Sequence, residues 1–327
     1  MVRPLDGITV VSLEHAIAAP FCTRQLADLG ARVIKVERPG SGDFERDYDH
    51  RADGLSSHFV WTNRSKESLT LDLKQPEALS VLKDLLRTAD VLIQNLAPGA
   101  AARMGLAYEV LSIANPLLIV CDISGYGNDG PLRDKKAYDL LIQSEAGFLS
   151  VTGTPEEPSK AGNSIADIAA GMYAYSSVLA ALLQRQRTGR GSSIDVSMLE
   201  GLGEWMSFPM YYAYEGQEPP TRNGASHATI YPYGPFEAGD GKTVMLGARV
   251  NSVGELWDHP QLNARKRFRT IDSPVGPLTA MLPPGVNSDF TYRMDAVPAV
   301  GEHSEAILRE LGRSDADISA LRAAGAF

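Results

Sequence analysis

A short apolar strand, a helix and a second apolar strand follow one another within the first 37 residues. The strands are expected at residues 7–13 and 32–37, and a helix opened by Pro20 and ended by Gly30 lies between them. Continuous runs rich in β-branched residues are typical of parallel strands that are buried on both faces. A helical crossover between parallel strands is right-handed and takes about 30 residues. This unit therefore restricts the chain to folds with a parallel sheet covered by helices.

The same alternation continues along the chain. Further strands are expected at 68–73, 90–94, 117–123, 193–196 and 242–248, and further helices at 76–87, 98–106, 198–206, 304–311 and 316–323. Strands that alternate with helices predict an α/β fold with a doubly wound, Rossmann-like sheet. We expect a large domain over 1–206, a linker and reduced small domain over 207–300, and C-terminal helices over 301–327 that return to the large domain.

Residues 164–191 predict one long helix whose residues are mostly small or apolar. Ser164 and Asp167 have the spacing of a capping box with Asp in place of Glu. Gly189 is a residue at which the helix can end. Gly171 and Ala174 lie on the same face as Asp167. That face carries one acid with no bulky side chain beneath it, so a ligand or another backbone could approach closely. A simple helix cap explains Asp167 equally well at this point.

Basic residues follow several of the expected strands. Lys35 and Arg38 flank the end of the second strand, Arg103 follows the strand at 90–94, and Lys136 follows the strand at 117–123. Ligands of doubly wound sheets bind outside the carboxyl ends of the strands. The recurrence favours a phosphate-bearing ligand, although ordinary surface charge explains any one of these residues.

Composition excludes several classes of function. The net charge of −9 argues against a nucleic-acid-binding protein. Two cysteines, Cys22 and Cys121, give no disulfide framework and fit a reducing compartment. The N-terminus has no apolar signal core, and no uncharged apolar run reaches the length of a membrane span. We therefore expect a cytoplasmic protein.

The chemical motifs of several enzyme classes are missing. Residues 125–130 match G-x-G-x-x-G after a strand, but Pro131 and a charged run follow where a dinucleotide site needs a helix. We interpret this segment as a strand-end loop near a site. The six histidines show no metal-ligand spacing, so no metal site is expected. No G-x-S-x-G elbow is present either.

Several segments taken together carry a family resemblance. They are P-L-D-G-I-T-V-V from Pro4, L-G-A-R-V-I-K-V-E-R-P-G-S-G-D from Leu29, N-R-S-K-E-S-L-T-L-D from Asn63, A-D-V-L-I-Q-N-L-A-P-G from Ala89, R-M-G-L from Arg103, I-S-G-Y-G from Ile123, I-A-D-I-A-A-G from Ile165, Y-P-Y-G-P-F-E-A-G-D-G-K from Tyr231, W-D-H-P-Q-L from Trp257 and G-E-H-S-E-A-I-L from Gly301. The chain resembles the class III CoA-transferases, the family of formyl-CoA transferase and carnitine CoA-transferase.

The resemblance implies a function and a mechanism. Asp167 stands where the family has its nucleophile, which carries CoA as an aspartyl thioester reached through a mixed anhydride. The positive end of the helix is expected to keep Asp167 ionised. Arg38, Arg103 and Lys136, with Tyr138 near them, stand where the family holds CoA; we add Lys35 to these cofactor-binding candidates. Members need no metal or permanently bound cofactor, and they form interlocked, ring-like homodimers.

The segments around residues 40–49 and 63–68 look most like those of members that act on C4–C5 dicarboxylates with succinyl-CoA as donor. A second carboxylate needs a partner, and the substrate candidates are His15, Ile17, Arg46 and Arg64. Each of these has a structural role as its alternative. Oxalate-like and carnitine-like acids are the alternative acceptors.

Two other functions remain open. One is a 2-methylacyl-CoA racemase, which shares the fold. These racemases carry a Gly-His-Asp segment, but this chain has Ala137-Tyr138-Asp139 at that place, so the base histidine is missing. A non-catalytic CoA-binding protein is the third reading. It gains support because family members usually have several dozen more residues between the strand near Val244 and Trp257. We favour an omitted segment over a true deletion, because both flanks remain family-like.

Overall fold

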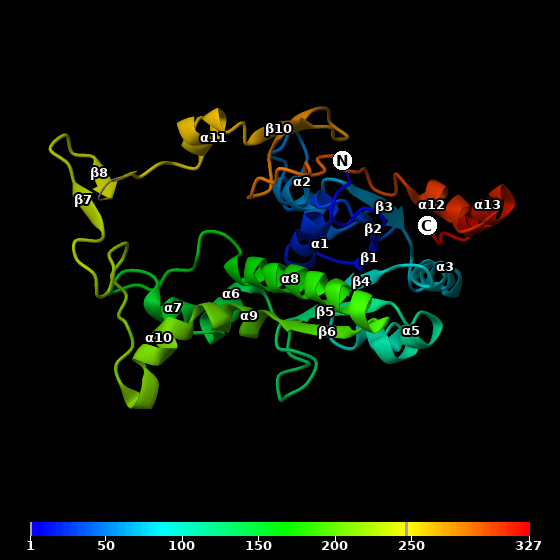
Figure 1. Cartoon of the computed structure of the whole chain (residues 1–327), viewed down its shortest axis with the longest axis horizontal. Helices are drawn as coiled ribbons and strands as arrows, with labels where there is room; N and C mark the ends of the chain where they lie inside the picture. The colour runs from blue at the N-terminus through cyan, green and yellow to red at the C-terminus, as the bar shows by residue number, and fades with distance from the viewer. Residues whose placement is uncertain (1, 246–247) are drawn as a thin grey trace.

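The computed structural model describes residues 2–245 and 248–327 of the chain. Its centre is a six-stranded sheet in the order β3-β2-β1-β4-β5-β6, in which every neighbouring pair is parallel (Figure 1). The strands are β1 (Thr9–Leu13), β2 (Arg32–Glu37), β3 (Lys66–Thr70), β4 (Val91–Gln94), β5 (Ile119–Ser124) and β6 (Ser193–Ser197). The strand order reverses between β1 and β4, so the doubly wound topology expected from the sequence is confirmed.

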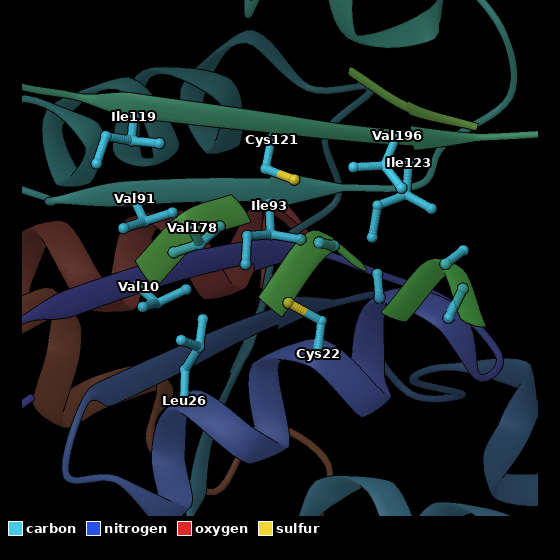
Figure 2. Packing of buried hydrophobic residues seen from close by; sticks show 14 of the residues in the cluster. Val10, Cys22, Leu26, Val91, Ile93, Ile119, Cys121, Ile123, Val178 and Val196 are labelled. Carbon is cyan, nitrogen blue, oxygen red and sulfur yellow. The ribbon is translucent and has the colours of Figure 1, made fainter. Parts of the chain in front are cut away.

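One face of the sheet is covered by three helices: α1 (Ala18–Asp28), α8 (Ile165–Thr188) and α9 (Met198–Trp205). Figure 2 shows how Leu26 of α1 and Val178 of α8 point toward the apolar side chains of the strands. All the residues of this layer that the figure labels are nearly or fully buried. The layer therefore fixes α1 and α8 against each other on one side of the sheet.

The opposite face uses the alternate residues of the same strands. Val11 is buried on this side, whereas its neighbour Val10 faces α1. The helices of this layer are α3 (Pro76–Leu86), α5 (Tyr108–Ala114), α12 (Ser304–Glu310) and α13 (Asp315–Ala323). The last two come from the end of the chain; α12 packs beside β3, and α13 packs against α12 (Figure 1).

The remaining elements are short and form two groups. One group surrounds the carboxyl ends of the strands, and the other makes up the segment after α9. The first group comprises η1 (Phe44–Asp47), α2 (Ser57–Asn63), α4 (Ala100–Arg103), α6 (Asp139–Glu145) and α7 (Phe148–Val151). The second group comprises α10 (Ser207–Tyr212), η2 (Tyr214–Gly216), β7 (Pro235–Glu237), β8 (Thr243–Met245), β9 (Ala248–Arg249), η3 (Gly254–Leu256), α11 (Pro260–Ala264), β10 (Phe268–Ile271) and β11 (Leu278–Met281). In Figure 1, β7 and β8 extend away from the layered body, and β10 returns beside α2.

The long helix expected from the sequence is α8, and its C-terminal end follows the prediction. Gly189 adopts a left-handed conformation with φ of 67° and ends the helix. Arg185 in the last turn pairs with Asp90 at 2.8 Å. By length and mean hydropathy α8 is the one helix of the described residues that could cross a membrane, but it packs against α1, α9 and the sheet instead.

Some expected elements differ from the structure. Ser164 occupies the N-cap position as predicted, but the predicted capping box is wrong, because the Ser164 side chain accepts no capping hydrogen bond. The third strand is Lys66–Thr70 rather than 68–73, since residues beyond Thr70 turn toward α3. Of the strand expected at 242–248, residues 243–245 form β8, and 246–247 lie outside the described residues. The helices α2, α5 and α6 were not expected.

Candidate active site

The candidate residues follow the carboxyl ends of the strands, as the doubly wound fold requires. His15 and Ile17 follow β1, Arg38 follows β2, and Arg103 ends α4 after β4. Lys136 and Tyr138 lie between β5 and α6, and Tyr138 is the residue before α6 begins. The side chains of Arg38, Arg103, Lys136 and Tyr138 are exposed, so they are accessible to a ligand.

Asp167 lies in the first turn of α8 and is partly exposed. Burial of its carboxyl group and the neighbouring charge of Asp139 raise its pKa to about 7. A backbone hydrogen bond from the N–H of Ala18, the first residue of α1, acts in the opposite direction. Burial and the charge of Asp139 thus act against the expectation that the helix end keeps Asp167 ionised, because both favour the protonated form.

The first turn of α8 is capped from another helix. Oδ1 of Asp139 accepts hydrogen bonds from the backbone N–H groups of Ala166 at 2.8 Å and Asp167 at 3.3 Å. Asp139 opens α6 and lies 28 residues before Asp167 in the sequence. The donors that a local Ser164 cap would have used are thus taken by a carboxylate from outside the helix.

Gly171 allows α1 to approach α8 closely. A Cβ atom at this position would lie 2.6 Å from the carbonyl oxygen of Ala18 and 3.1 Å from the ring of Phe21. The backbone of Ala18 therefore passes directly over the small face of α8, one turn below Asp167. The prediction that another backbone could approach this face is confirmed.

We expect Gly171→Ala to displace α1 and to reduce the free energy of unfolding by about 1–3 kcal/mol, because a backbone oxygen cannot move aside as a flexible side chain can. The matched control is Gly203→Ala in α9, where an added Cβ meets nothing within 4 Å. That substitution should be neutral or stabilise the helix by up to about 1 kcal/mol. Urea unfolding of the two variants compares them, and equal stability would contradict the close-packing role of Gly171.

Aromatic rings line the segment between β2 and α2. His15 stacks on Phe44 with ring centroids 5.4 Å apart, and Phe44 contacts Tyr48 at 5.8 Å. Burial, with the charges of Glu45, Asp43 and Asp167, raises the pKa of Tyr48 to about 12. Tyr48 is therefore a neutral phenol that lies near enough to Asp167 to sense its charge. The segment between β2 and α2 thus contributes side chains at this edge of the sheet.

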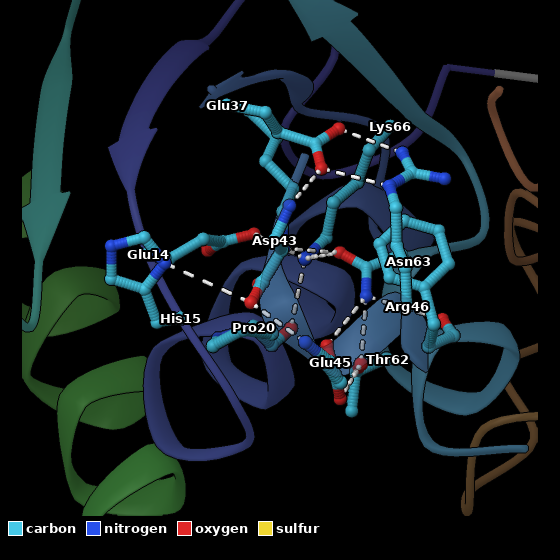
Figure 3. Close-up of polar contacts among 12 residues, drawn as sticks. Glu14, His15, Pro20, Glu37, Asp43, Glu45, Arg46, Thr62, Asn63 and Lys66 are labelled. Atoms are coloured by element: carbon cyan, nitrogen blue, oxygen red, sulfur yellow. Dashed lines mark hydrogen bonds and ion pairs between the residues drawn. The ribbon is translucent and has the colours of Figure 1, made fainter. Parts of the chain in front are cut away.

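A buried ionic cluster lies beside the ring of His15 (Figure 3). Nζ of Lys35 is 2.7 Å from Asp43 and 3.6 Å from Glu14. Nζ of Lys66 is 2.7 Å from Glu14, and both lysines donate to Oδ1 of Asn63. Lys35 is fully buried. This contradicts the expectation that it binds CoA, because it has no surface to offer a phosphate.

Glu45 is the third acid beside these two lysines. Burial raises its pKa to about 7, although the charge of Lys35 opposes the shift. Its Oε1 accepts a hydrogen bond from Thr62 at 2.9 Å. Asp43 in turn caps η1 by accepting one from the backbone N–H of Glu45. The cluster therefore anchors the segment that carries Phe44 and Tyr48.

Two of the arginines proposed for substrate binding are held in structural ion pairs. Arg46 makes two hydrogen bonds to Glu37, at 2.9 and 2.7 Å, and its guanidinium stacks 3.8 Å from the centre of the Phe59 ring. Arg64 is nearly buried and makes two hydrogen bonds to Asp28. These contacts contradict a substrate role for either arginine. Ile17 is buried at the start of α1, and His15 keeps a partly exposed ring whose Nδ1 lies 3.7 Å from Asp43.

A cavity of about 440 Å³ opens at the carboxyl ends of β4 and β5. Gln94, Asp122 and the loop 96–99 line it, together with the start of α4, the helix that ends at Arg103. Its volume lies in the range of small-ligand sites. A cavity of about 660 Å³ between α2 and β10–β11 is larger, but none of the candidate residues lines it.

The sequence interpretation missed three parts of this site: Asp139, the Ala18 N–H and Tyr48. Asp139 directly follows Tyr138 and was noted only as part of a segment without histidine. An acid in a loop after a strand was the available signal, but nothing local shows that it caps a helix 28 residues later. The Ala18 N–H carries no sequence signal, because every residue except proline has one.

The sequence profile of CoA-transferase family III matches residues 5–249. The chain is 35% identical over 276 residues to the human succinyl-CoA:glutarate CoA-transferase, an alignment that covers 82% of this chain and 63% of that protein. It is 40% identical over 251 residues to the succinate–glutarate CoA-transferase of Agrobacterium fabrum, with 74% and 62% covered. The chain thus spans less than two thirds of the length of these relatives.

Further similarity extends to other substrates and to solved structures. The acetyl-CoA:oxalate CoA-transferase of Acetobacter aceti is 38% identical over 270 residues, which cover 81% of this chain and 69% of that protein. The crystal structure of a CAIB/BAIF family protein from Brucella suis has a TM-score of 0.87 and 29% identity, and covers 95% of this chain and 100% of that one. A Mycobacterium tuberculosis protein with a TM-score of 0.80 and 24% identity shares the fold, with 94% and 99% covered.

Proposed function

The chain belongs to CoA-transferase family III, and on that premise we propose that it transfers CoA from an acyl-CoA donor to a small carboxylic acid, with Asp167 as the nucleophile. The observation that carries the proposal is the placement of Asp167. Asp167 is a partly exposed residue at the start of α8, and its carboxyl group faces the backbone N–H of Ala18 across the contact that Gly171 permits.

The reaction consists of four acyl transfers at one carboxylate. The ionised carboxylate of Asp167 attacks the donor thioester, whose C–S bond breaks to give a mixed anhydride and CoA thiolate. The thiolate attacks the aspartyl carbonyl carbon, which forms an aspartyl-CoA thioester and releases the donor acid. The acceptor carboxylate then attacks that thioester, which forms a second mixed anhydride and releases CoA thiolate. The thiolate attacks the acceptor carbonyl carbon of this anhydride. Acyl-CoA product leaves and Asp167 is regenerated.

The residues around Asp167 have separate roles in this proposal. The Ala18 N–H donates to the oxygen on which negative charge develops at the aspartyl carbonyl. Arg38, Arg103 and Lys136 bind the phosphates of CoA from the carboxyl edge of the sheet, with Tyr138 beside them. The cavity next to α4 accommodates part of the nucleotide.

We propose succinyl-CoA as donor and a C4–C5 dicarboxylate as acceptor, in agreement with the glutarate-specific names of two relatives. With Arg46 and Arg64 held in ion pairs, His15 is the remaining candidate partner for the second carboxylate. Its ring is partly exposed and stacks on Phe44, which contacts Tyr48.

A panel of acids tests the function. The protein is incubated with succinyl-CoA and glutarate, citramalate, mesaconate, itaconate, malate, oxalate or carnitine, and the CoA products are read by mass spectrometry. We expect new CoA thioesters with the dicarboxylates. Absence of product from every acid would contradict the proposal, and deuterium exchange at C2 of a 2-methylacyl-CoA would identify a racemase instead.

We also propose that the protein acts as a homodimer, as the resemblance implies. Large apolar side chains are exposed along the segment after α9; among them Phe208 is 60% and Tyr211 76% exposed. Such a surface is typical of a region covered by a partner. Sedimentation velocity should show a species of twice 35.2 kDa, and a monomer at micromolar concentration would contradict the dimer. The cytoplasmic location and the lack of a bound cofactor stay predictions.

A further inference from the structure

The Asp139 carboxylate is held in place from both sides. Its Oδ1 accepts the N–H groups of Ala166 and Asp167, and its Oδ2 accepts a hydrogen bond at 2.6 Å from the amide of Gln143. Gln143 is fully buried, and its own Oε1 accepts the backbone N–H of Ala161 at 2.9 Å. Three hydrogen bonds therefore tie the carboxylate to α6 and to the start of α8, and a fourth, made by Gln143, extends the network to the loop before α8.

This arrangement disfavours the ionised form of Asp167 in two ways. The N–H donors at the start of a helix stabilise a nearby negative charge, but here Asp139 uses two of them. It also brings its own negative charge beside the Asp167 side chain. A second negative charge favours the protonated form of its neighbour, and a more basic carboxylate is the better nucleophile once it is ionised.

On the premise of the proposed function, we propose that Asp139 is a positioning residue that fixes the start of α8 and sets the pH range in which Asp167 is ionised. The other groups that bear on Asp167 come from different elements. They are the Ala18 N–H of α1 and the phenol of Tyr48 after η1, which senses both Asp167 and Tyr138. Tyr48 stays neutral below pH 11 or so, because its pKa is raised to about 12. Asp139 is thus the charged neighbour that acts on Asp167.

Two variants separate the charge of Asp139 from its contact with Gln143. Asp139→Asn removes the charge and keeps an oxygen that can accept the N–H groups at the start of α8. Its NH2 group replaces the oxygen that accepts from the Gln143 amide, so two donors then face each other. Gln143→Met breaks the same contact in a similar volume and leaves the charge in place. If the Asn variant is unstable, Asp139→Ser provides a neutral acceptor of the kind that caps helices.

The first measurement is the pH profile of CoA transfer. The rate should rise with pH through about 7 in the unmodified protein, because the ionised form of Asp167 reacts. We expect Asp139→Asn to move this midpoint down by about one pH unit and Gln143→Met not to lower it. An unchanged midpoint in a folded Asp139→Asn protein would overturn the proposal, since a purely structural cap changes the rate without moving the midpoint.

The second measurement needs no turnover. Asp167→Asn should raise Tm more at pH 8 than at pH 4, because it removes a charge that only the folded state disfavours. This gain should shrink when Asp139 is already Asn. An equal gain in both backgrounds would overturn the role of Asp139 even if transfer is observed. Failure of every acid in the panel would instead contradict the proposed function and leave this thermal test valid.

Discussion

Asp167→Asn will abolish CoA transfer, with a loss of about 10³-fold or more in kcat. The amide has the shape of the carboxyl group but cannot form the anhydride, so no residual covalent route remains. The measurement is the rate of succinyl-CoA consumption with the best acceptor from the panel. Residual activity within tenfold of the unmodified protein would contradict the nucleophilic role of Asp167.

The same variant should fold at least as well as the unmodified protein. The pKa of Asp167 is raised from an ordinary carboxyl value to about 7, so the unfolded chain loses its proton near pH 4 and the folded chain keeps it to about pH 7. Stability therefore falls as pH rises through this window. Asn at this position removes the dependence, and a lower Tm at pH 8 would show that Asp167 contributes stability, which contradicts the raised pKa.

Lys35→Met will reduce the free energy of unfolding at pH 7 by about 3–5 kcal/mol, because it leaves a buried carboxylate without its partner. Lys35 pairs with Asp43 at 2.7 Å, and both side chains are fully buried. The charge of Lys35 lowers the pKa of Asp43, and the charges of Lys66 and Lys35 together lower the pKa of Glu14, despite the burial of both carboxyl groups. Denaturant unfolding at several pH values measures the loss.

The loss should narrow as the pH falls below about 4. Carboxylates with lowered pKa values contribute stability at neutral pH, and this contribution disappears when they are protonated. The control is Lys242→Met, which removes an exposed lysine paired with Asp240 and should change the stability by less than about 0.5 kcal/mol. A loss for Lys35→Met as small as that of the control would contradict the account of the buried cluster.

The sequence predicted the large sheet well because its signals are local. The strands at 7–13 and 32–37 are short apolar runs, and the helix expected between them makes this pair a parallel, right-handed crossover unit. The small helices were harder to predict. α6 begins at Asp139 within a loop that carries few apolar residues, and its position depends on Gly125, where an added Cβ would lie 2.1 Å from the Cβ of Ala137.

The site was predictable only in part. The first-turn position of Asp167 and the small face below it are local properties of one helix, and both were found. The roles of Lys35, Arg46 and Arg64 depend on partners such as Asp43, Glu37 and Asp28, whose proximity only the fold creates. A basic residue after a strand has the same appearance in the sequence whether it faces a ligand or a buried acid. This is why three of the proposed cations prove to be structural.

The most direct test of the central claim is to trap the covalent intermediate on Asp167. The protein is incubated with succinyl-CoA and hydroxylamine, and its peptides are analysed by mass spectrometry. Hydroxylamine attacks the aspartyl-CoA thioester and leaves a hydroxamate on the side chain, so activity should be lost only when acyl-CoA is present. We predict the hydroxamate on Asp167. Modification of a different carboxylate, or retained activity without any modification while transfer proceeds, would contradict the account.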